Sequence, residues 1–147
     1  MPRSQNELVG ALLVLSVAAC GSAKHYADLP EKNLQVRTAA TGARVVMGVH
    51  ALDSKCAADY EGVVALDRPL VEVGLPPGRP SLLVFEFYSS SLLSGSSSTK
   101  KEARLVPRPG YRYEARVSYK DALYDVELRE VDPRTGTGRE LDTRRRC

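Results

Sequence analysis

Apolar and polar side chains alternate strictly in the second half of the chain. Across Tyr111–Tyr119 every second residue is a tyrosine, alanine or valine, whereas the residues between them are Arg, Glu, Arg and Ser. The alternation returns across Tyr124–Arg129, after a turn at Lys120-Asp121. A period of two is typical of a strand with one buried and one solvated face. The pattern therefore predicts an antiparallel hairpin with its tyrosines, valines and leucine toward the core.

Other β-prone runs alternate with turns rich in proline and glycine. The most apolar run is Leu82–Tyr88, in which Leu83, Phe85 and Phe87 share one face and are expected to point into the core. The remaining predicted strands cover residues 34–40, 43–52, 62–66, 70–73 and 101–106, with a short basic segment from residue 139. About seven to eight short strands with regular turns predict an all-β fold, an antiparallel β-sandwich.

One stretch between two predicted strands is rich in serine. Residues 89–99 read SSSLLSGSSST, a low-complexity sequence without a charged residue. Such compositions are typical of mobile loops. We therefore expect a surface loop here.

The first nineteen residues follow another pattern. A polar start containing Arg3 precedes the apolar run Leu8–Val17, and the small residues Ala18 and Ala19 follow. This order is typical of a secretory signal peptide, which is helical, and the run is shorter than the ~20 residues of a membrane span. The sequence thus predicts a signal peptide (1–19), a flexible tether (20–31) and a β-sandwich domain (32–147).

The end of this leader, Val17-Ala18-Ala19-Cys20, resembles the lipobox of bacterial lipoprotein precursors. The resemblance implies that Val17, Ala18 and Ala19 direct cleavage before Cys20. It also implies that Cys20 receives a diacylglycerol on its thiol and an N-acyl chain (palmitate) on its amine. Two or more acyl chains anchor a protein stably. The alternative is a secreted protein whose Cys20 merely lies near a cleavage site.

The residue after the cysteine bears on which membrane is expected. Gly21 stands where family members retained at the inner membrane carry an aspartate. The resemblance therefore implies an exported protein anchored in the periplasmic leaflet of the outer membrane.

The cysteine count fits a lipid on Cys20. The chain has three cysteines, an odd number for an exported protein. With Cys20 carrying lipid, Cys56 and Cys147 remain as an even pair. Because the periplasm is oxidising, the sequence predicts a disulfide between them.

Charge and motifs limit the function classes. A net charge of +3 and a pI near 8.8 are mild, so no nucleic-acid partner is expected. Hydrolase elbows, phosphate-binding loops and zinc signatures do not occur in the sequence. The two histidines, His25 and His50, are interpreted as surface residues. We expect no catalytic residue, no metal site and no cofactor beyond the covalent lipid.

The mature part has a looser resemblance. A corner at Leu75–Gly78 before a strand, and a strand starting after Pro109-Gly110, are similar to small PEGA-like and transthyretin-like β-sandwich lipoproteins of the bacterial envelope. The lipobox, the predicted sandwich and the lack of catalytic motifs together predict a non-catalytic binding or structural module, held to the membrane by its lipid. Envelope proteins, lipopolysaccharide or peptidoglycan would be its partners. The alternative is an accessory lipoprotein subunit of a secretion or envelope-assembly complex.

The C-terminal region is rich in arginine. If a disulfide pinned Cys147 to Cys56, these side chains would present fixed forks suited to phosphate or carboxylate. The alternative is a frayed, solvated tail. A second candidate surface is an aromatic face formed by the tyrosines of residues 111–124, for which the alternative is a place in the core. The arginines of the predicted anion-binding patch are Arg134, Arg139, Arg144, Arg145 and Arg146.

Overall fold

The computed structural model describes residues 23–91 and 95–143, and every regular element within them is a strand. The leader with Val17, Ala18, Ala19 and Cys20 lies outside the described residues, as do Arg144, Arg145, Arg146 and Cys147. The nine strands are β1 (Leu34–Ala40), β2 (Ala43–Leu52), β3 (Ala58–Ala65), β4 (Leu70–Val73), β5 (Ser81–Ser91), β6 (Gly95–Leu105), β7 (Arg112–Lys120), β8 (Leu123–Val131) and β9 (Gly138–Glu140).

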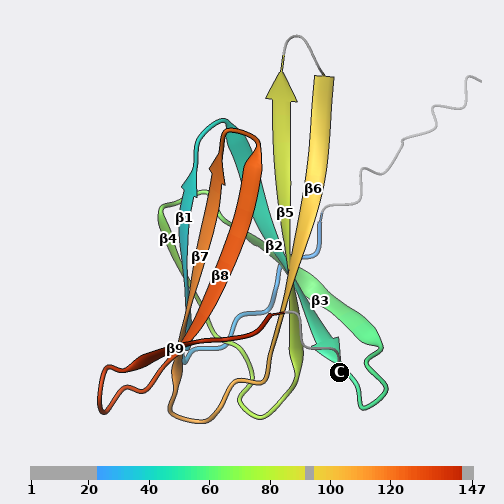
Figure 1. Ribbon diagram of the computed structural model, residues 1–147. Helices are drawn as coiled ribbons and strands as arrows, with labels where there is room; N and C mark the ends of the chain where they lie inside the picture. The colour runs from blue at the N-terminus through green and yellow to red at the C-terminus, as the bar shows by residue number, and fades with distance from the viewer. Residues whose placement is uncertain (1–22, 92–94, 144–147) are drawn as a thin grey trace, which may run out of the picture.

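The strands form two sheets that pack face to face (Figure 1). One has five strands in the order β4-β1-β7-β8-β9, and the other has four in the order β3-β2-β5-β6. All neighbours are antiparallel except β1 and β7, which pair in parallel from Leu34 opposite Tyr113 onward. The predicted fold class, an all-β sandwich, is confirmed.

The core lies between the sheets and follows the alternation in the sequence. On β7, Tyr113, Ala115 and Val117 are buried, as the period of two predicts. Phe85 and Phe87 on β5 are completely buried on the facing sheet. Burial of a valine or phenylalanine side chain contributes roughly 1.5–3 kcal/mol. The core therefore fixes which face of each strand is solvated.

The serine-rich stretch differs from the expected loop. β5 continues to Ser91 and β6 begins at Gly95, so most of residues 89–99 is paired strand. The Oγ atoms of Ser89 and Ser97 lie 2.8 Å apart across the two strands. In Figure 1 this ribbon, the β5–β6 arm, extends past the ends of the facing strands. The buried half of β5 and β6 sets the register, and the pairing continues outward although serine is not enriched in strands.

The segment before β1 lies against the sandwich from residue 24, inside the span expected to be a tether. Tyr26 N–H donates to the carbonyl of Val63, and Val63 N–H donates to the carbonyl of Lys24. The hydroxyl of Tyr26 donates to the carbonyl of Gly74, 3.1 Å away. Asp28 accepts the N–H of Gly74. This N-terminal segment, residues 24–33, thus covers part of the outer edge of β3.

Candidate functional site

A buried carboxylate lies at one end of the five-stranded sheet. Glu130, near the end of β8, is only 6% exposed. It continues the inward face of β8 two residues beyond Leu128 and sits directly opposite Tyr113 of β7. A carboxylate in this position needs partners, because an uncompensated buried charge is strongly unfavourable.

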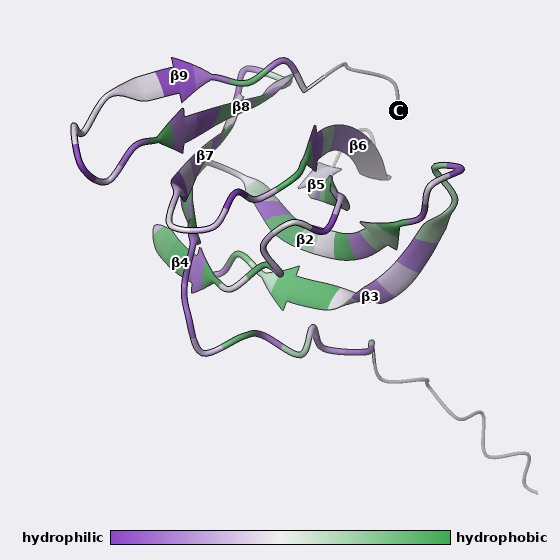
Figure 2. Ribbon diagram, turned by 90° about the horizontal axis from the view of Figure 1, so that it is seen from below, coloured by the Kyte–Doolittle hydropathy of each residue, from purple (hydrophilic) through white to green (hydrophobic). Residues whose placement is uncertain are grey.

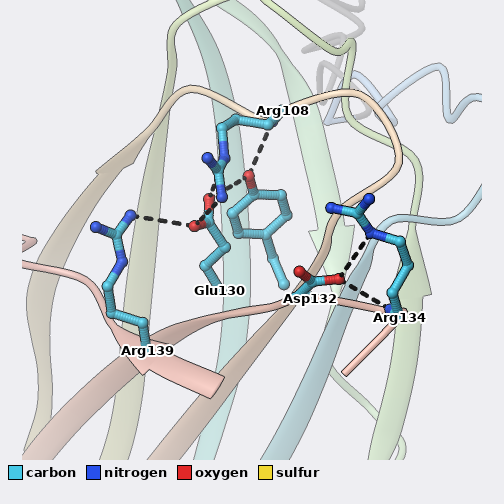
Figure 3. Close-up of polar contacts among 6 residues, drawn as sticks. Arg108, Glu130, Asp132, Arg134 and Arg139 are labelled. Carbon is cyan, nitrogen blue, oxygen red and sulfur yellow. Dashed lines mark hydrogen bonds and ion pairs between the residues drawn. The ribbon is translucent and has the colours of Figure 1, made fainter. Parts of the chain in front are cut away.

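Two arginines and a tyrosine supply these partners (Figure 3). Arg108 binds both carboxylate oxygens of Glu130, with its Nε 3.1 Å from Oε2 and its Nη2 2.7 Å from Oε1. The Nη2 of Arg139, on β9, lies 3.1 Å from Oε1. The hydroxyl of Tyr113 donates to Oε2 at 2.9 Å. Glu130 therefore accepts four hydrogen bonds, three of them from cationic groups. We call Arg108, Tyr113, Glu130 and Arg139 the arginine cluster.

Arg108 is held by its backbone as well as by its side chain. Its N–H donates to the hydroxyl of Tyr113, 2.8 Å away, and its guanidinium lies 3.7 Å from the centre of the Tyr111 ring. A guanidinium over an aromatic face is attracted by the negative face of the ring. The turn between β6 and β7 thus fixes the guanidinium instead of leaving it to sample solvent.

The surroundings determine the protonation of the cluster. Burial by itself would raise the pKa of Glu130, but the hydrogen bonds from Tyr113 and Arg108 and the charges of Arg108 and Arg139 outweigh burial and lower it. Burial raises the pKa of the Tyr113 hydroxyl, and the bond to Glu130 raises it further, although the Arg108 N–H acts in the opposite direction. At neutral pH Glu130 is therefore an ionised acceptor and Tyr113 a protonated donor.

One carboxylate compensates only one of the two guanidiniums. The side chain of Glu130 is 7% exposed, whereas those of Arg108 and Arg139 are 50% and 71% exposed. The cluster therefore carries one net positive charge on its solvated side. Arg134, on the neighbouring turn, pairs with Asp132 at 3.6 Å and adds no net charge (Figure 3).

The structure places two arginines of the predicted patch and adds one that the sequence analysis did not select. Arg139 belongs to the cluster and Arg134 lies in the turn before it, whereas Arg144, Arg145 and Arg146 lie outside the described residues. Arg108 lies in the sequence Pro107–Gly110, which predicts only a turn. Glu130 was also missed, although the inward alternation from Tyr124 to Leu128 leads directly to it.

The other selected residues have different surroundings. Cys56 lies in the β2–β3 turn with a left-handed backbone (φ 65°), and Cys147 lies outside the described residues, so their disulfide stays a prediction. His25 is exposed, and His50 packs against Tyr60 with ring centres 5.2 Å apart.

The tyrosines of residues 111–124 do not form one binding face. Tyr113 is in the core, and Tyr111 lies beneath Arg108. Tyr119 and Tyr124 stack on each other at the other end of the β7–β8 hairpin. The single aromatic face that we considered is therefore absent from this hairpin.

Two features are absent from the residues that the structure describes. Within residues 23–91 and 95–143, His, Cys, Asp and Glu side chains do not gather in a group of three that could hold a metal ion. The same residues contain no helix long and apolar enough to cross a membrane.

Comparison with models of protein families, with curated proteins and with solved structures finds no significant match to this chain.

Proposed function

We propose that this chain is a lipid-anchored envelope protein whose β-sandwich is a non-catalytic binding module for anionic groups. The arginine cluster supports the anionic ligand. Arg108 uses two of its five N–H donors on Glu130, and Arg139 uses one. The other donors of two oriented guanidiniums can form paired bonds to a carboxylate or phosphate. The predicted neighbours Arg144, Arg145 and Arg146 would add charge to the same patch.

The position of the N-terminal segment suggests where this patch faces. Three residues separate Cys20 from Lys24, and the four steps between these two residues can span at most about 14 Å. A lipid on Cys20 would therefore keep the outer edge of β3 close to the membrane surface. Figure 2 shows β9 on the opposite side of the sandwich from the N-terminal segment. On this proposal the arginine cluster faces away from the anchoring membrane, toward the carboxylates of peptidoglycan.

The anchor is tested by labelling cells with a fatty-acid probe. We expect the parent chain to carry the label and to fractionate with membranes, and Cys20→Ser to lose both properties. Equal labelling of the two forms would rule out a lipid at Cys20. An ordinary secreted protein would remain in the soluble fraction in both forms.

The anionic ligand is tested by sedimenting the full chain with purified peptidoglycan or anionic liposomes across a salt series. We expect binding to peptidoglycan that weakens with salt, because exposed charges are screened. Arg139→Gln, alone or with Arg144, Arg145 and Arg146 replaced by Ala, should weaken it further. Arg139 is the choice because Arg108 still compensates Glu130 in its absence.

Arg68→Gln is the matched control, since this exposed arginine lies on the β3–β4 connection, away from the cluster. Its binding should equal that of the parent. If parent and cluster variants bind alike at every salt concentration, or neither binds, the arginine cluster has no such role. Binding to liposomes alone would overturn the proposed orientation.

A further inference from the structure

A concavity of about 600 Å³ opens at the end of β7 opposite the arginine cluster. Its walls are the end of β1 and the turn that follows, residues 38–41, and the end of β7 with Tyr119, Lys120 and Asp121. None of these residues takes part in the arginine cluster. The concavity is therefore separate from the arginine cluster.

The aromatic wall of this concavity is held rigidly. Tyr119 stacks on Tyr124, with ring centres 4.7 Å apart and planes 23° from parallel. Tyr124 in turn meets Phe87 edge-on at 5.0 Å, and Phe87 is completely buried. One face of the Tyr119 ring is thus fixed to the core through a second ring, and the partly buried Tyr119 also lines the concavity.

The contacts of Tyr124 extend this support to the β5–β6 arm. Hydrogen bonding to the hydroxyl of Ser89 on β5 lowers the pKa of Tyr124, against the effect of burial, and hydroxyls of Thr99, Tyr119 and Ser97 act in the same direction. Ser89 and Ser97 also pair with each other. The arm therefore holds the ring behind Tyr119 in place, which gives the serine-rich strands a supporting role.

The rim beside the ring is polar and electrically balanced. Lys120 and Asp121 carry opposite charges next to each other, and Thr41 adds a hydroxyl. Asp121 and Ala122 both have left-handed backbones, with φ of 53° and 60°. Two such residues form the tight turn of a β-hairpin, and alanine adopts this conformation only at a cost of roughly 1–2 kcal/mol. Strained turns of this kind cluster at ligand sites.

We propose that this concavity binds one sugar ring of an uncharged saccharide. The C–H face of a sugar ring can lie on the exposed part of Tyr119, which buries apolar surface. Sugar hydroxyls can donate to the carboxylate of Asp121 and accept from the ammonium of Lys120. Because the charges of Lys120 and Asp121 offset each other, the rim has no net charge that would favour an anion, and an apolar ligand would form no hydrogen bonds with these polar groups. The inference is independent of the anchor and of the arginine cluster.

The direct test is a nuclear magnetic resonance titration of the full chain, purified in a mild detergent, with three soluble probes. These are the N-acetylglucosamine tetramer, cellotetraose and maltotetraose. We expect at least one probe to shift signals of residues 38–41 and 119–121 in a saturable way. Shifts centred elsewhere, or no shift with any probe at millimolar concentration, would overturn the inference. A response to a peptidoglycan stem peptide but to no saccharide would overturn it as well.

Variants test the role of the ring. Tyr119→Ala should weaken binding about tenfold, the size expected for truncation of a central aromatic contact, whereas Tyr119→Phe should retain it. Tyr60→Ala is the control, since Tyr60 is exposed on β3 of the other sheet. If Tyr119→Ala does not fold, Asp121→Asn serves in its place, because asparagine tolerates the left-handed backbone. Unchanged affinity in whichever of these two variants folds would contradict the site.

Discussion

At the scale of single residues, the buried carboxylate of Glu130 connects several elements at one end of the β-sandwich. It stands where the alternation of β8 calls for an apolar side chain. Glutamate is accommodated because Arg108 approaches from the β6–β7 turn and Arg139 from β9, so that three separate elements meet at one carboxylate. A buried ion pair adds little net stability, but removing one partner is costly. We therefore expect the cluster to fix the relative positions of these elements.

Replacement of Glu130 by Gln tests this role. Gln keeps the shape but removes the charge that both arginines use, so we expect the free energy of unfolding to fall by about 2 kcal/mol at pH 7. Glu127→Gln is the control, because this glutamate is exposed on the opposite, solvated face of the same strand. Its replacement should change the free energy of unfolding by less than about 0.5 kcal/mol. Denaturant unfolding measures both.

Comparison of the parent protein with Glu130→Gln also gives a pH dependence of stability with a defined sign. The folded pKa of Glu130 lies below its ordinary value near 4.5, so its contribution to stability is present above that pH. It is lost as pH falls through the folded pKa. The difference between parent and Glu130→Gln should therefore be largest at neutral pH and disappear in acid. A difference that is equal at pH 3 and pH 7 would show that ionisation of Glu130 is irrelevant.

At the scale of elements, the sequence predicted strands well wherever one face enters the core. The predicted bounds of β1, β2 and β4 agree with the structure, because alternation or an apolar run ends at a turn residue in each case. The serine-rich composition of the β5–β6 arm predicts a loop instead of strands. Its pairing continues the register set by the buried residues Leu83 and Phe85. This tertiary cause cannot be recognised from the local composition. The sequence did not predict the arginine cluster for the same reason, because its members come together only after folding.

The N-terminal segment depends on close approach to a glycine. A Cβ added at Gly74 would lie 2.5 Å from the carbonyl oxygen of Leu29 and 2.6 Å from that of Glu31. Gly74→Ala should therefore push this segment off the sheet, with loss of about 2 kcal/mol of stability. Hydrogen exchange at the amide of Tyr26, which is bonded to Val63, should become faster.

Gly48→Ala provides the comparison for this substitution. Gly48 lies within β2, where an added Cβ would have its nearest neighbour, Nε2 of His50, at 3.4 Å. Alanine here should leave Tyr26 exchange unchanged and preserve or slightly raise stability, because glycine weakens a strand interior by roughly 0.5–1 kcal/mol. If both alanine variants behave alike, the N-terminal segment does not depend on the space at Gly74.

At the scale of the whole molecule, the two ends of the β7–β8 hairpin differ in chemistry. One end carries the arginine cluster with net positive charge, and the other carries the balanced rim beside Tyr119. The proposed lipid at Cys20 would act at the edge of β3, on the opposite sheet. A module so arranged could hold a polymer that offers both carboxylates and sugar rings while its anchor remains in a membrane. C-terminal arginines held near the domain would add positive charge to such a module.

The predicted disulfide between Cys56 and Cys147 would hold them there. It closes a loop of roughly 90 residues, for which the chain-entropy model gives about 4–5 kcal/mol, less any strain. Mass spectrometry of the exported protein without reduction should find one cross-linked pair of peptides containing these residues. Reduction should lower the midpoint of thermal unfolding and, on our proposal, weaken salt-dependent binding to peptidoglycan.

The variant Cys56→Ser distinguishes the effect of the disulfide from the effect of the arginine charges. It keeps every arginine, so weakened binding in this variant would show that the arginines act because they are pinned. Its turn should persist, since Asp53 Oδ1 accepts the N–H groups of Lys55 and Ala57, both at 2.8 Å. Two free thiols in the exported parent protein would eliminate the disulfide. Binding that is unchanged in Cys56→Ser would show that the disulfide is not needed and that the arginine cluster, with or without a solvated tail, is sufficient.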